Sequence, residues 1–129
     1  MIRPVVAVLA LAVSGAGCAG GHDCTTVGGV SRVFVDVVAL GPEVTGSTVC
    51  VDGACSDSLG SGQALAPLPG DEAGTHDVTV TVHGPGGREL AKGSGTFATT
   101  ERRPNGEGCD PVLQQITLVM DANGQLTPR

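Results

Sequence analysis

Residues 48–56 read TVCVDGACS and carry the clearest structural signal in this chain of 129 residues. An Asp-Gly pair between two short runs, here Asp52 and Gly53, is typical of a two-residue turn that joins antiparallel strands. In that register Cys50 faces Cys55 at a non-hydrogen-bonded position, where Cα atoms lie about 4.5 Å apart. Such a separation suits a disulfide. The stretch therefore predicts a β-hairpin closed by a Cys50–Cys55 bond.

Further strands are predicted on both sides of this hairpin, because apolar and polar residues alternate there with period two and many are β-branched. Residues 76–83 (HDVTVTVH) place Val78, Val80 and Val82 toward a core. The other predicted strands are residues 30–40, 88–98 and 113–120, with an edge strand at 125–127. Gly93 and Gly95 are expected to weaken or bulge the strand that contains them. Residues 57–75 and 99–111 are predicted to be long loops.

Six or seven short strands with no helical periodicity favour an all-β fold. We expect residues 30–129 to form a small antiparallel β-sandwich, immunoglobulin-like or transthyretin-like in architecture and stapled by two disulfides. A small barrel is the alternative.

The N-terminal residues suggest an export signal. Arg3 precedes the apolar run at residues 4–13 (PVVAVLALAV). Ten residues are too few for a transmembrane helix, which needs about 20. A short apolar run behind a basic residue is typical of a secretory signal peptide.

Residues 14–18 (SGAGC) then resemble the lipobox of bacterial lipoproteins, in which small residues precede a cysteine. This resemblance covers residues 1–21. It implies that residues 1–17 are a signal peptide, that Cys18 becomes the acylated (palmitate-bearing) first residue, and that residues 18–29 form a lipidated tether. Cleavage after Ala16 without lipidation is the alternative.

The cysteine count bears on this choice. The chain has five cysteines, and an odd number in an exported protein leaves one thiol unpaired. Lipidation of Cys18 would leave four. With Cys50 bonded to Cys55, the remaining pair is Cys24 and Cys109.

Composition excludes several functions. The net charge of -6 argues against nucleic acid and anionic membrane surfaces as electrostatic partners.

His76 and His83 are an odd number of residues apart on one predicted strand and so point to opposite faces, which disfavours a shared metal. We expect no catalytic residue, no metal and no cofactor. Arg102 and Arg103 are the one basic cluster and a candidate anion-binding site.

Taken together, these features predict an exported bacterial lipoprotein, anchored to the cell membrane by its lipid and facing outward. It would act as a binding or structural module of the cell envelope, not as an enzyme, with an envelope protein or ligand as its partner. The loops at 57–75 and 99–111 are the expected binding surfaces. The alternative is a small secreted hydrolase or enzyme inhibitor without lipid.

Overall fold

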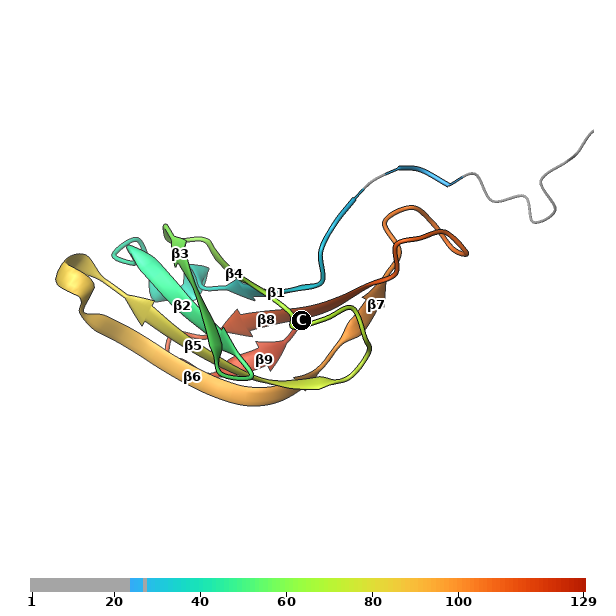
Figure 1. Ribbon diagram of the computed structural model, residues 1–129. Helices are drawn as coiled ribbons and strands as arrows, with labels where there is room; N and C mark the ends of the chain where they lie inside the picture. Colours follow the sequence, from blue (N-terminus) through green and yellow to red (C-terminus); the bar gives the residue numbers. More distant parts are fainter. Residues whose placement is uncertain (1–23, 27) are drawn as a thin grey trace, which may run out of the picture.

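The computed structural model describes residues 24–26 and 28–129, and it shows an all-β sandwich of two sheets (Figure 1). The proposed signal peptide and Cys18 lie outside these residues. Nine strands occur in the described part: β1 (Arg32–Asp36), β2 (Gly46–Val51), β3 (Ala54–Leu59), β4 (Gln63–Pro67), β5 (Thr75–His83), β6 (Glu89–Ala98), β7 (Thr100–Arg102), β8 (Leu113–Met120) and β9 (Leu126–Pro128). Two single-turn 3-10 helices, η1 (Val38–Leu40) and η2 (Pro85–Gly87), complete the list.

The first sheet has the order β3-β2-β5-β6 and is antiparallel throughout. The predicted hairpin is its edge, with Cys50 opposite Cys55 and Val51 opposite Ala54. Asp52 and Gly53 both have positive φ, 49° and 87°, as this turn requires.

The second sheet has the order β4-β1-β8-β7, and β9 also pairs with β8. Its central pair, β1 and β8, is parallel. Only antiparallel pairs were expected from the sequence, and this pair is the exception. Two parallel strands need a crossover connection of about a dozen residues or more between them. Here the whole first sheet lies in the chain between β1 and β8. Only Thr99 separates β6 from β7, so the chain passes from one sheet to the other at this point.

The core lies between the sheets and consists mainly of valine, as the alternation predicts. Val33 and Val35 of β1 and the three valines of β5 are fully buried. Leu118 and Met120 of β8 are the largest side chains that are completely enclosed. Because each strand contributes alternate residues, the outer faces of both sheets carry polar and half-buried side chains.

Several predicted boundaries are wrong. The strand expected at 30–40 ends at Asp36, and Ala39 is exposed because the chain turns into η1. The expected loop at 57–75 contains the end of β3 and all of β4, and the loop at 99–111 contains β7.

The two glycines of β6 do not form the bulge that was expected of them. Gly93 and Gly95 stay in register with Val80 and Val78, and the irregularity lies near the start of the strand, opposite the step from Val82 to His83. A Cβ on Gly93 would clash with the carbonyl of Gly124, and one on Gly95 would lie 2.7 Å from the Phe97 ring. These glycines are therefore explained by close packing.

Both predicted disulfides are confirmed. Cys50–Cys55 joins β2 and β3, with Cα atoms 3.9 Å apart. Cys24–Cys109 joins the N-terminal segment to the loop between β7 and β8, with Cα atoms 5.6 Å apart.

Candidate functional site

The outer face of the second sheet carries a row of polar and charged side chains that begins on β1. Because Val33 and Val35 point into the core, Arg32 and Phe34 point outward. Arg32 lies opposite Gln115 of β8 in the parallel register. On the other side of β8, β7 pairs antiparallel and brings Arg102 opposite Leu113.

These residues surround a cleft of about 210 Å³, which we call the arginine cleft. Its walls are Arg32 and Phe34 from β1, Arg102 from β7, Leu113 and Gln115 from β8, and the extended segment 28–30. Pro104 and Gln114 also line it, and no Asp or Glu of residues 24–26 and 28–129 does.

The two arginines of the cleft have no carboxylate partner within the part of the chain that the structure describes. The Arg32 guanidinium lies 5.9 Å from the centroid of the Phe34 ring, which fits a cation–π contact. Arg102 Nη1 donates to Gln115 Oε1 at 3.0 Å, and Gln115 Nε2 donates to Thr117 Oγ1 at 2.6 Å. Arg102 is therefore oriented by a neutral amide that is itself held by a neighbour.

Arg103, the second member of the predicted basic pair, is placed differently. Its Nε and Nη2 both donate to the carboxylate of Glu101, each at 3.2 Å. This ion pair is exposed and balances the charge of Arg103. The structure thus groups Arg102 with Arg32, which sequence reasoning had not singled out.

The two segments expected to be binding loops meet at one end of the sandwich. The Gly74 N–H donates to Thr99 Oγ1 at 3.0 Å, and the Thr99 N–H donates to the Gly74 carbonyl at 2.8 Å. In addition, Ser31 Oγ donates to Asp71 Oδ1 at 2.6 Å. The ends of these loops and the residue that precedes β1 therefore lie close together.

The N-terminal segment is fastened to this same end, which we call the tether end. Besides the Cys24–Cys109 bond, Thr25 Oγ1 donates to Asn105 Oδ1 at 2.7 Å. Asn105 is buried, and its Nδ2 donates to the Asp110 carbonyl at 2.7 Å. The turn that contains η2 lies at the opposite end of the molecule (Figure 1).

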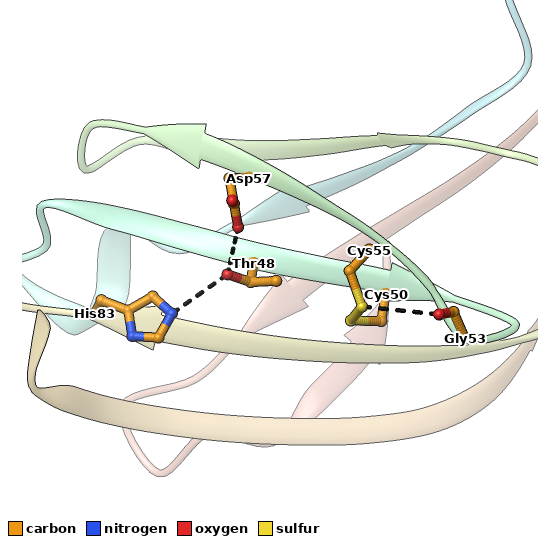
Figure 2. Close-up of a disulfide and its surroundings, with 6 residues drawn as sticks. All are labelled: Thr48, Cys50, Gly53, Cys55, Asp57 and His83. Atoms are coloured by element: carbon orange, nitrogen blue, oxygen red, sulfur yellow. Dashed lines mark hydrogen bonds between the residues drawn. A yellow bond between two sulfur atoms is a disulfide. The ribbon is translucent and has the colours of Figure 1, made fainter.

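A second polar cluster lies on the outer face of the first sheet, near the hairpin disulfide (Figure 2). Thr48 Oγ1 donates to Asp57 Oδ1 at 2.7 Å and lies 3.3 Å from His83 Nε2. A nucleophilic hydroxyl would instead give its proton to the imidazole. Here Thr48 donates to the carboxylate of Asp57, so the three side chains are not arranged as a Ser-His-Asp triad, in which the hydroxyl donates to the histidine.

The two histidines of β5 lie near opposite ends of the strand. His76 Nδ1 is 2.6 Å from Asp52 Oδ2, near the start of β5, whereas His83 is the last residue of that strand. Among the described residues, no three His, Cys, Asp or Glu side chains are grouped so that they could hold a metal ion. The same part of the chain contains no helix long and apolar enough to cross a membrane.

No protein-family model, curated protein or solved structure matches this chain. The candidate site is therefore chosen by its geometry. The arginine cleft is that site, because it holds two arginines that have no carboxylate partner among the described residues.

Proposed function

We propose that this protein is an exported bacterial lipoprotein whose sandwich domain is a binding module held close to the outer surface of the cell membrane. The signal-like residues 1–17 would direct export, and acylated Cys18 would anchor the mature chain. The arginine cleft is the proposed binding site of this module.

The disulfide pairing is the observation that carries this proposal. Four of the five cysteines are used in two intramolecular bonds. Cys18 is left without a cysteine partner in the chain, and a free thiol is unusual in an exported protein. Acylation would use this remaining thiol, and two acyl chains suffice for stable anchoring without a transmembrane segment.

The position of the tether supports a membrane-proximal domain. Six residue steps separate Cys18 from Cys24, and an extended chain covers at most about 3.6 Å per step, or roughly 20 Å in all. Since Cys24 is bonded to Cys109, the tether end would lie within that distance of the lipid. The arginine cleft, which has residues 28–30 as one wall, would be near the membrane as well.

Replacement of the proposed lipid site tests this function. In Cys18→Ser the protein should move from the membrane pellet to the soluble exported fraction, because the thiol that would carry the lipid is gone. Intact-mass spectrometry of the parent should show an acylated N-terminal Cys18.

The matched control is Ser14→Ala, which keeps a small residue in the signal and should stay in the pellet. An unmodified N-terminus at Gly17 in the parent would favour the secreted alternative, and pelleting of Cys18→Ser like the parent would rule out the lipid anchor.

A further inference from the structure

We infer that the arginine cleft binds a small free organic anion, a carboxylate or phosphate group joined to an apolar body. This inference names a ligand class for the proposed binding module, but it depends only on the cleft and not on the lipid anchor.

The charge distribution is the first argument. The chain has 13 acidic and 7 basic side chains, yet among the described residues two basic side chains line this cleft and no acidic one does. Arg32 contacts an aromatic ring and Arg102 a neutral amide, so neither guanidinium charge is balanced by an ion pair within the described residues. Unpaired guanidinium groups at a partly enclosed site are suited to bind oxyanions.

The strand register makes the two charges converge. Arg32 and Gln115 are cross-strand neighbours, and neighbouring strands lie about 4.8 Å apart. Arg102 is already hydrogen-bonded to the Gln115 side chain from the other side. An oxyanion above Gln115 would therefore be within reach of both guanidinium groups, and no carboxylate of the described residues pairs with either of them.

The walls of the cleft indicate the rest of the ligand. Phe34, Leu113 and Val30 give it an apolar side. A second hollow of about 200 Å³ shares Val30 and Arg32 with the first and continues over residues 65–67 of β4. Small-molecule sites usually measure about 300–1,000 Å³, so each hollow alone fits only a small group. An anion at the two arginines with an apolar body toward β4 matches this shape.

Charge also favours a free ligand over an anionic lipid surface. The tether end carries Glu101, Glu107 and Asp110 in the stretch from β7 to β8, and Asp71 and Glu72 in the segment after β4. These five acids outnumber the three arginines there, Arg32, Arg102 and Arg103, and would repel a negatively charged bilayer. A small anion can enter the cleft without bringing further negative charge close to them.

This inference is tested by titrating the full-length exported protein with small anions and following its backbone amide chemical shifts. If the protein carries lipid, the titration is done in detergent micelles. The probes are sodium benzoate, sodium acetate and inorganic phosphate at constant ionic strength. We expect the amide shifts to move at residues 28–34, 102–103 and 113–115. Benzoate should bind about tenfold more tightly than acetate because it also buries a ring.

The variants separate a built site from general charge effects. Arg32→Gln and Arg102→Gln should each weaken benzoate binding about tenfold or more, and Arg32→Lys should lie between the parent and Arg32→Gln, because lysine keeps the charge but loses the fork of donors. Arg88→Gln removes the same charge next to η2, at the opposite end of the molecule, and should change binding less than twofold. Circular dichroism verifies that each variant is folded.

Three results would overturn the inference: no saturable shift with any of the three anions, equal weakening by Arg88→Gln, or arginine-dependent binding only to phosphatidylglycerol vesicles and not to free anions. The mass of the Cys18 N-terminus, measured on the same sample, reports separately on the lipid anchor. A failed titration with an acylated Cys18 therefore rejects the ligand and keeps the anchor.

Discussion

Asp52 occupies the first turn position of the β2–β3 hairpin and ties that turn to β5. Its Oδ2 lies 2.6 Å from His76 Nδ1, and its Oδ1 accepts a hydrogen bond from the Asp77 N–H at 2.9 Å. The hydrogen bond with His76 and then that from Asp77 lower the pKa of Asp52 below its ordinary value. The turn residue that shapes the hairpin backbone thus also holds the hairpin against the neighbouring strand by its charge.

This lowered pKa predicts a loss of stability in acid. A carboxyl whose folded pKa is below its unfolded value of about 3.9 stabilises the fold above that pH and ceases to do so as pH falls through the folded pKa. Asp52→Asn keeps a good turn residue and one acceptor oxygen, and it removes the charge and the second acceptor oxygen. The difference in melting temperature between parent and variant should be largest near pH 5 and shrink toward pH 2.

Glu43→Gln serves as the control, because Glu43 is an exposed acid outside these contacts. Its melting temperature should follow that of the parent at every pH. A difference between Asp52→Asn and the parent that persists unchanged at pH 2 would show that the carboxylate charge is not what holds the turn.

At the scale of the element, the alternation of apolar and polar residues identified which face of each central strand is buried. It did not identify which strands pair with one another. Val78, Val80 and Val82 of β5 are all fully buried, as expected. β4 was missed because it is short, ends in proline and buries only Ala64 and Ala66, a pattern that resembles a loop. It is a strand because β1 offers it a free edge for backbone hydrogen bonds.

The assignment of inner and outer faces to β5 predicts a large loss of stability for one substitution and a small loss for its neighbour. Val80→Asp would bury an unpaired carboxylate between the sheets, at a cost of about 3–5 kcal/mol, and should unfold the domain or nearly so. Thr79→Asp lies on the outer face between Cys50 and Ser94, and should cost about 1 kcal/mol or less.

Far-ultraviolet circular dichroism is the appropriate measurement, since the chain has no Trp or Tyr to report by fluorescence. Equal melting temperatures for Val80→Asp and Thr79→Asp would contradict the assignment of inner and outer faces.

At the scale of the molecule, the two disulfides constrain very different lengths of chain. Cys24 and Cys109 are 85 residues apart, whereas Cys50 and Cys55 are 5 apart. On the chain-entropy model the long loop is worth about 4.5 kcal/mol and the hairpin ring about 2 kcal/mol. The long bond closes a loop that contains β1 to β7, and it fastens the tether to the sandwich.

Breaking the long bond should therefore destabilise the domain more than breaking the short one. The comparison is between Cys24→Ser with Cys109→Ser and Cys50→Ser with Cys55→Ser, each as a double variant that leaves no new free thiol in the described part of the chain. Urea unfolding followed by circular dichroism gives the two free-energy losses, and a larger loss for the hairpin pair would contradict this ranking.

The sequence by itself determined the all-β class, the hairpin register and, through it, both disulfides, because turn chemistry and period-two alternation are local properties of the chain. Arg102 could be identified as a candidate anion-binding residue because it is next to Arg103 in the sequence. Its grouping with Arg32, however, depends on the parallel pairing of β1 with β8 and the antiparallel pairing of β7 with β8. The first pairing joins residues 83 positions apart, and together the two pairings bring two arginines 70 positions apart to one site. No local pattern in the sequence signals such a grouping, so only the tertiary structure decided where the cleft is and which two charges it brings together.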